Sequence, residues 1–252
     1  MFKKVIVILL ITVSFISVSF SSSFKEYDIH LIPSKEVTLY IKDFNEFLDS
    51  KGLLKKYNIT PFIVNHPAHI TLYLTGFSPE KIPFIEENIE NITQNISEFN
   101  IELTNINVNN SGFIMLDVEN SNELKLFSDT IVSSLSQYRN SEYSIPKWVK
   151  YYPQKNESFT KYGSPNTFSE FTPHFSIMAI SLDDEQQKQN FIKDMSNAIA
   201  EFRAKPIKAK IVAISLGEVD KNGQIIKELL TIPLKQNSNK NIVNHKKGEN
   251  HV

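Results

Sequence analysis

The chain contains no cysteine, which limits both how it can be stabilised and which metal sites it can build. Without disulfides the fold must depend on its core, and 252 residues with 41% hydrophobic content can bury a sizeable one. Zinc sites made from thiolates are excluded. We expect one globular unit or two small lobes.

The chain also lacks an excess of charge of either sign. It has 27 basic and 28 acidic residues, a formal net charge of -1, and no long basic run. A protein that binds duplex DNA must neutralise many phosphates with lysine and arginine. We therefore expect no duplex DNA partner, whereas a small phosphate-containing ligand is compatible with this composition.

Residues 1–23 have the pattern of a secretory signal peptide. Lys3 and Lys4 precede an apolar stretch over residues 5–20, and three serines follow it at residues 21–23. We expect cleavage near Phe24, no stable membrane anchor, and a location outside the cell, in a periplasm or in the lumen of a secretory pathway. A signal retained as an anchor is the alternative.

The remaining polar features concern the surface and the C-terminus. Residues 236–252 are polar, and we expect them to form a disordered tail. Five Asn-X-Ser/Thr sequons would be glycan acceptors in a eukaryotic secretory pathway, although an Asn- and Ser-rich chain also produces them by chance. They begin at Asn58, Asn91, Asn95, Asn109 and Asn156.

Hydrophobic periodicity predicts that strands and helices alternate through residues 24–235. The second half repeats the first in outline, with a histidine-containing strand, a helix and a hairpin. Strands are expected at 27–33, 62–64, 70–74, 101–108, 113–118, 174–181, 210–216 and 225–234; helices are expected at 37–48, after 78–79, at 124–138 and at 191–202. The last two strands flank an Asn222-Gly223 turn.

One segment, residues 139–170, shows neither period and is rich in aromatic residues. A stretch of this length without regular structure is uncommon inside a compact domain unless it is functional or disordered, and the aromatic content argues against disorder. We predict an ordered, irregular insertion that acts as a lid or joins two lobes.

A short pattern of histidine, apolar residue and hydroxyl residue occurs twice, as His69-Ile70-Thr71 and His174-Phe175-Ser176. Both copies lie in apolar runs typical of strands, and alternate residues of a strand point to the same face. We therefore expect His69, Thr71 and Tyr73 to share one face of the first strand. In the second strand, His174, Ser176 and Met178 are expected to share a face.

Two imidazoles that face one cleft can act as a base and an acid. One would take a proton from water while the other donates a proton to the leaving oxygen of a phosphodiester. The hydroxyls of Thr71 and Ser176 could donate hydrogen bonds to the non-bridging phosphate oxygens. This chemistry requires neither a metal nor a cofactor.

The two motifs make the chain resemble the 2H phosphoesterase superfamily, which includes 2′-5′ RNA ligase-like proteins and cyclic nucleotide phosphodiesterases. The resemblance extends over roughly residues 27–234. It implies an α+β fold with two pseudo-symmetric lobes of antiparallel sheet, outer helices and a central cleft. It also implies His69 and His174 as the catalytic pair, Thr71 and Ser176 as phosphate ligands, and a hydrolase for 2′,3′-cyclic phosphates, cyclic nucleotides or short 2′-5′-linked oligonucleotides.

Other interpretations remain open at this point. The two histidines could be structural, or the cleft could bind a nucleotide or an RNA end without turnover. His30 could line the cleft from the first strand, but we expect it at the surface. His66 is expected to be a loop or structural residue. A zinc site made from His66, His69 and His174 would need an irregular strand and a further ligand.

The aromatic segment leaves a similar choice. Tyr152, Lys161 and Tyr162 could form a wall on which a nucleobase stacks, or they could pack the segment onto the lobes. Tyr73 could contact the ligand or pack between lobes. Either histidine could be the base, and a monomer is expected.

Overall fold

The computed structural model describes residues 24–203 and 205–236. The predicted signal peptide and nearly all of the predicted polar tail lie outside this range. Within it, the regular elements alternate in the expected manner. The strands are β1 (Lys25–Pro33), β2 (Ile70–Phe77), β3 (Phe99–Val108), β4 (Phe113–Val118), β5 (His174–Ala179), β6 (Ile207–Val219) and β7 (Ile225–Pro233). The α-helices are α1 (Lys35–Ser50), α2 (Leu53–Tyr57), α3 (Ile82–Thr93), α4 (Asn122–Leu135), α5 (Pro153–Tyr162) and α6 (Glu185–Phe202).

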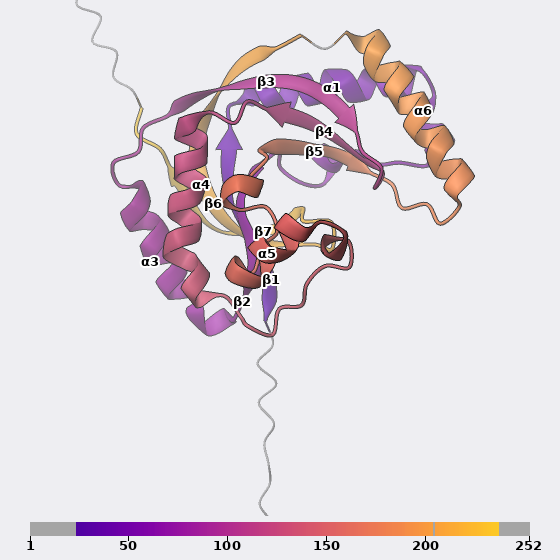
Figure 1. Cartoon of the computed structure of the whole chain (residues 1–252). Coiled ribbons are helices and arrows are strands. Elements are labelled where there is room, and N and C mark those ends of the chain that lie inside the picture. The colour runs from indigo at the N-terminus through magenta and orange to yellow at the C-terminus, as the bar shows by residue number, and fades with distance from the viewer. Residues whose placement is uncertain (1–23, 204, 237–252) are drawn as a thin grey trace, which may run out of the picture.

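The long strand β6 joins two halves of one open antiparallel sheet (Figure 1). The strand order is β2-β1-β6-β3-β4-β5, and β7 also pairs with β6. The first part of β6 pairs with β3, whereas its later part pairs with β1 on one side and β7 on the other. The first lobe is therefore β2-β1-β6-β7 and the second is β6-β3-β4-β5, which confirms the predicted α+β class and antiparallel pairing.

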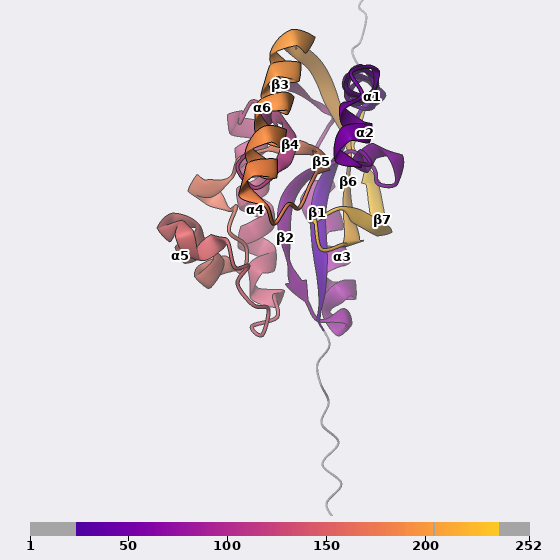
Figure 2. The same ribbon diagram turned by 90° about the vertical axis from the view of Figure 1, so that its right-hand side faces the viewer.

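Helices cover the sheet at both ends of the molecule (Figures 1 and 2). Helix α4 lies beside β2 and contacts α3, whereas α6 lies beside β3 and contacts α1. The longer helices α1, α3, α4 and α6 bury apolar stripes, as Val37, Ile41, Phe44 and Leu48 do in α1. No helix within residues 24–203 and 205–236 is long and apolar enough to span a membrane.

The predicted strand at residues 62–64 is wrong. Phe62–Val64 is a 3-10 helix, in which the Val64 amide donates to the Pro61 carbonyl at 3.1 Å. The five residues between Pro61 and Pro67 are too few to build a ladder, so the backbone satisfies its hydrogen bonds locally.

The segment 139–170 is more regular than predicted, because it contains α5. This helix buries only Ser158 and Phe159, so it gives a weak hydrophobic period. Its ends carry a clearer signal: Pro153 starts the helix, and Gly163 follows it with φ +73°. A Cβ on Gly163 would meet Arg139 Cδ at 2.6 Å, so this close packing requires glycine.

Candidate active site

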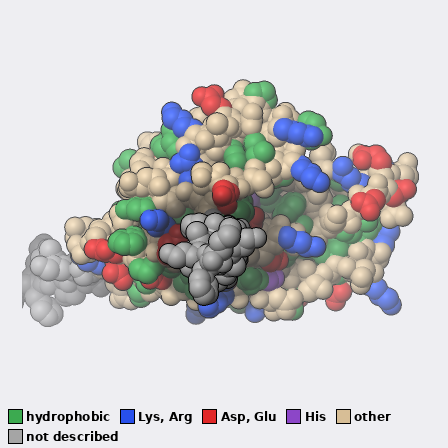
Figure 3. Space-filling view, turned by 90° about the horizontal axis from the view of Figure 1, so that it is seen from below, with side chains coloured by type: hydrophobic (Ala, Val, Ile, Leu, Met, Phe, Trp, Pro, Cys, Tyr) green, Lys and Arg blue, Asp and Glu red, His purple; other side chains and the backbone are tan. Residues whose placement is uncertain are grey.

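The two predicted motifs lie at opposite ends of the strand order yet come together in space. His69 immediately precedes β2, and His174 is the first residue of β5. The sheet bends so that β2 and β5 contact each other. The charge of His174 also influences the pKa of His69, which places the two imidazoles within electrostatic range. In Figure 3, histidine side chains are visible in the hollowed part of the surface.

Both imidazoles are anchored in the same way. Nδ1 of His69 is 3.0 Å from the carbonyl oxygen of Pro67, and Nδ1 of His174 is 2.8 Å from that of Thr172. A carbonyl can only accept, so Nδ1 carries the hydrogen in each ring. In a neutral ring this leaves the lone pair on Nε2, the atom that can then exchange a proton with a substrate.

A β-bulge follows the hydroxyl residue of the first motif. Thr71 pairs with His30 and Tyr73 pairs with Ile29, so Leu72 is an extra residue in β2. Because His30 and Ile29 point to opposite faces of β1, Thr71 and Tyr73 also lie on opposite faces. The expectation that Tyr73 shares the face of His69 and Thr71 is therefore wrong.

The second motif has a bulge at the same position. Ser176 pairs with Met115 and Met178 pairs with Ile114, so Ile177 is the extra residue. Met178 is consequently turned away from Ser176 into the core and is fully buried. The predicted sharing of a face by His174, Ser176 and Met178 fails at Met178 for the same reason as at Tyr73.

His69 lies in a buried environment. Its side chain is 6% exposed, and burial, with smaller contributions from His30 and His174, lowers its pKa from 6.5 to about 4. Hydrogen bonds to the carbonyls of Pro67 and Gly223 offset only part of this lowering of the pKa. At neutral pH the imidazole is therefore neutral and able to accept a proton.

Asp28 is the closest acidic group to the first motif, and the sequence analysis missed it. The Thr71 hydroxyl donates to Asp28 Oδ2 at 2.5 Å, and His69 Nε2 is 3.6 Å from the same oxygen. Asp28 is fully buried, and burial raises its pKa to about 7 despite the opposing effects of His30 and Thr71. The only signal in the sequence is an aspartate two residues before His30, within the buried part of β1.

His30 is buried, which corrects the expectation that it lies at the surface. Its ring is 5.3 Å from that of His69, and its Nε2 is 3.2 Å from Glu228 Oε1. Burial would lower the pKa of His30, but the hydrogen bond to Glu228 and the charge of Asp28 raise it above its usual value. Burial would raise the pKa of Glu228, but His30 and a hydrogen bond from Ser215 hold it below its usual value. His30 and Glu228 thus form an ion pair beside His69.

The second motif has a different polar neighbour. Asp117 pairs directly with His174 across β4 and β5, and residues paired in this way share a face. The amide of Asn107 donates to both oxygens of Asp117, at 2.7 and 2.8 Å. Ser176 is partly exposed, and no hydrogen-bond partner for its hydroxyl lies among residues 24–203 and 205–236.

Of the remaining candidate residues, Tyr73 and Tyr162 pack against other parts of the chain. Tyr73 is 1% exposed and donates to the Tyr162 carbonyl at 2.5 Å, so it packs between β2 and α5. The Tyr162 ring lies against Phe168, with the ring centroids 4.5 Å apart. Tyr152, which precedes α5, and Lys161 of α5 are exposed, and a contact between them and a substrate stays a prediction.

His66 is held by the backbone: its Nδ1 lies 2.9 Å from the Ile225 carbonyl. No group of three or more histidine, aspartate or glutamate side chains in the described part of the chain is arranged to hold a metal ion.

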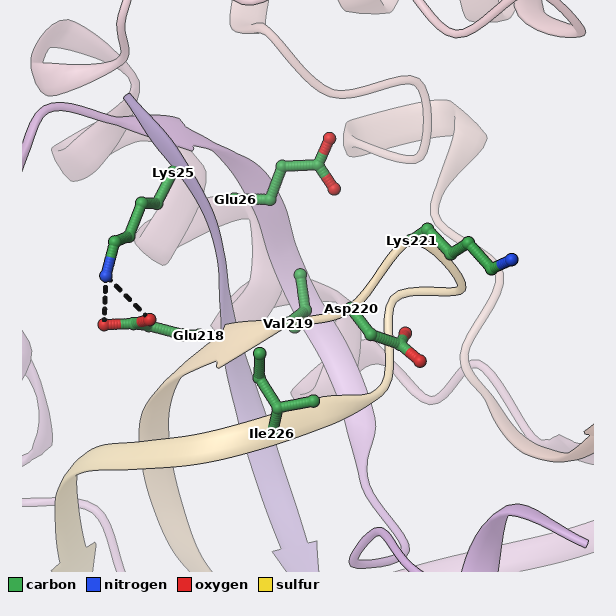
Figure 4. Close-up of a pocket in the computed structure, with 7 residues that line it drawn as sticks. All are labelled: Lys25, Glu26, Glu218, Val219, Asp220, Lys221 and Ile226. Carbon is green, nitrogen blue, oxygen red and sulfur yellow. Dashed lines mark hydrogen bonds and ion pairs between the residues drawn. The ribbon is translucent and has the colours of Figure 1, made fainter. Parts of the chain in front are cut away.

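A separate surface pocket lies beside the start of β1 and the end of β6 (Figure 4). Lys25 Nζ contacts both carboxylate oxygens of Glu218 there, at 3.0 and 3.1 Å. Its lining residues include neither of the two motifs: they are Lys25, Glu26, Glu218, Val219, Asp220, Lys221 and Ile226.

The chain belongs to the 2′-5′ RNA ligase superfamily, whose family model matches residues 54–223. This range contains both motifs, so the resemblance seen in the sequence is confirmed at the level of the superfamily. No curated protein sequence matches the chain.

The chain is similar to two solved structures at low sequence identity. E. coli LigT, in a crystal structure with 3′-AMP, is 12% identical with a TM-score of 0.50, and the match covers 85% of this chain and 100% of LigT. Usb1 of Kluyveromyces marxianus is 12% identical with a TM-score of 0.46, over 85% of this chain and 99% of Usb1. The similarity to LigT supports the fold alone, and the activity of this chain must be argued from its own site.

Proposed function

We propose that this protein is a metal-independent phosphodiesterase in which His69 and His174 act as a base and an acid. The observation that carries the proposal is the matched anchoring of the two imidazoles, each with Nδ1 on the carbonyl two residues earlier. This arrangement directs proton exchange to Nε2 in both motifs. The proposed substrates are 2′,3′-cyclic phosphates, cyclic nucleotides and short 2′-5′-linked oligonucleotides.

The different environments of the histidines support a division of roles. The pKa of about 4 keeps His69 unprotonated at neutral pH, as a general base must be. His69 Nε2 takes a proton from water as the water oxygen attacks phosphorus. The bond from phosphorus to the ribose oxygen breaks, and His174 donates its Nε2 proton to that oxygen. Thr71 and Ser176 bind the non-bridging oxygens, where negative charge is concentrated.

The experiment compares the wild type with His69→Ala and His174→Ala on 2′,3′-cyclic nucleotides and a 2′-5′ dinucleotide in the presence of EDTA. Each substitution should lower kcat by about 10²–10⁴-fold, because it removes one proton-transfer group. His66→Ala is the matched control, since that histidine bonds to a backbone carbonyl and should leave turnover intact.

Two outcomes would contradict the proposal. Turnover that survives either substitution would remove the assigned roles. Tight binding of these nucleotides by the wild type without turnover would instead favour a module that binds a nucleotide or an RNA end.

We also propose that residues 1–23 direct export and are removed. Strand β1 begins at Lys25, so cleavage before Phe24 would leave every strand complete. N-terminal sequencing of the protein from its native cells should begin near Phe24, and recovery of Met1 would contradict this proposal.

A further inference from the structure

We propose that Asp28 is a positioning residue that controls phosphate binding by Thr71, and that the site binds a phosphodiester only when Asp28 carries a proton. The inference rests on the proposed function, because it states which protonation state of Asp28 allows the site to bind its phosphodiester substrate. It concerns a residue outside both motifs, on a strand that precedes them.

The first step is the direction of the hydrogen bond. The Thr71 hydroxyl has a single hydrogen, and it donates this hydrogen to Asp28 Oδ2 at 2.5 Å. This distance is typical of a hydroxyl bonded to an ionised carboxylate. Non-bridging phosphate oxygens are acceptors, so the Thr71 hydroxyl cannot donate its one hydrogen to Asp28 and to a phosphate at the same time.

The second step concerns charge. Asp28 has no exposed surface, its Oδ1 has no hydrogen-bond partner, and Oδ2 is 3.6 Å from His69 Nε2. An ionised Asp28 would place a negative charge directly behind the atoms proposed to meet the phosphate. It would therefore repel the substrate as well as occupy its hydrogen-bond donor.

A proton on Asp28 removes both obstacles. The neutral carboxyl no longer repels the phosphate, and the Thr71 hydroxyl can rotate and donate into the cleft. One proton is taken up from solvent when the phosphodiester binds to the ionised site. Burial raises the pKa of Asp28 to about 7, so this proton is available near neutral pH.

Three histidines lie near Asp28 or near His69 and could add to the pH dependence of binding. His30, on the same strand, forms an ion pair with Glu228 of β7. His69, which precedes β2, has a pKa of about 4 and stays neutral across the relevant range. His174 of β5 is the remaining group within electrostatic range of His69, and the experiment must remove it.

The test measures binding of 2′,3′-cyclic AMP to His174→Ala by calorimetry from pH 5.5 to 8.5. This background removes the second imidazole, slows turnover under the proposed function, and uses a phosphodiester that does not titrate in this range. Linkage to one proton with a pKa of about 7 should weaken binding about tenfold between pH 6 and pH 8. Adding Asp28→Asn should make binding independent of pH and at least as tight as the parent is at pH 6.

Three further variants in the same background separate positioning from folding. Thr71→Ser keeps the hydroxyl and should keep the pH dependence, whereas Thr71→Val should lose the gain in affinity at pH 6. Asp129→Asn is the matched control, because Asp129 of α4 also has a buried oxygen without a partner but bonds to Lys125. It should bind as the parent does at every pH.

The proposal is overturned if the Asp28→Asn variant keeps the parent's pH dependence, or if the parent shows none. Sulfate, which also does not titrate in this range, is measured in parallel. Binding of sulfate with the Asp28 dependence but no binding of cyclic AMP would reject the proposed substrate and retain the role of Asp28. Binding of neither anion at any pH would reject both.

Discussion

The two motifs share their backbone geometry and differ in their surroundings. Each anchors its imidazole on a carbonyl two residues earlier, and each is followed by a bulge after its hydroxyl residue. The hydroxyl of Thr71 is held by the buried Asp28, whereas the Ser176 hydroxyl has no partner in the described residues. The comparison teaches that one strand geometry can be repeated while burial and neighbouring charges give its two copies different chemistry.

The largest effect that tests this comparison is expected from Asp28→Asn, which should change how the free energy of unfolding depends on pH. A carboxyl with a pKa of about 7 in the folded protein and 3.8 in the unfolded chain binds more protons when folded, so its contribution to stability falls as pH rises from about 4 to 7. Asparagine does not titrate. Between pH 5 and pH 8, the free energy of unfolding of the wild type should fall by about 2–3 kcal/mol relative to Asp28→Asn.

Urea denaturation of both proteins at pH 5 and pH 8 measures this difference. Asp117→Asn, beside the second motif, is the matched substitution at a carboxylate that is only partly buried. If the wild type and Asp28→Asn lose stability equally between pH 5 and pH 8, the buried Asp28 does not distinguish the first motif as described.

A second, smaller effect is expected from the two hydroxyl residues. Thr71→Ala leaves the buried Asp28 without its donor and should cost about 1–3 kcal/mol of unfolding free energy at pH 8. Ser176→Ala should stay within about 0.5 kcal/mol of the wild type. Both should raise KM for a phosphodiester. Thermal unfolding and steady-state kinetics of both variants measure these effects. A loss of stability in Ser176→Ala but not in Thr71→Ala would contradict the described difference between the two motifs.

The smallest effect is expected at the contact that supports Asp117. Asp117→Asn turns one of the two acceptors of the Asn107 amide into a donor and should lower the unfolding free energy by about 1 kcal/mol. Asn107→Asp should cost more, because it sets two carboxylates against each other. Chemical denaturation of both variants measures the order of these losses, and a reversed order would contradict the proposed contact.

Local sequence patterns predicted much of the fold because they reflect local physical requirements. The apolar stripe of α1 and the Asn222-Gly223 turn between β6 and β7 require no knowledge of distant residues. The prediction failed at residues 62–64, where the apolar run is too short for a strand. It also failed at α5, because this helix buries few residues and only the proline and glycine at its ends indicate a helix.

The candidate site was predictable only in part. The repeated spacing identified His69 and His174, because a strand gives alternate residues a common direction. It could not identify the bulges that turn Tyr73 and Met178 away, since a bulge is defined by pairing with another strand. The assignments of His69 and His174 as catalytic residues, and of Thr71 and Ser176 as phosphate ligands, stay predictions.

The sequence by itself determined the superfamily, the two histidine motifs, and the order of strands and helices outside residues 53–64 and 139–170. Only the tertiary structure decided that Asp28, His30 and Glu228 surround one motif and that Asp117 adjoins the other. The physical reason is that hydrophobic periodicity is local, whereas burial and charge pairing join distant residues. Asp28 meets Thr71 from 43 positions away, and His30 meets Glu228 from 198 positions away.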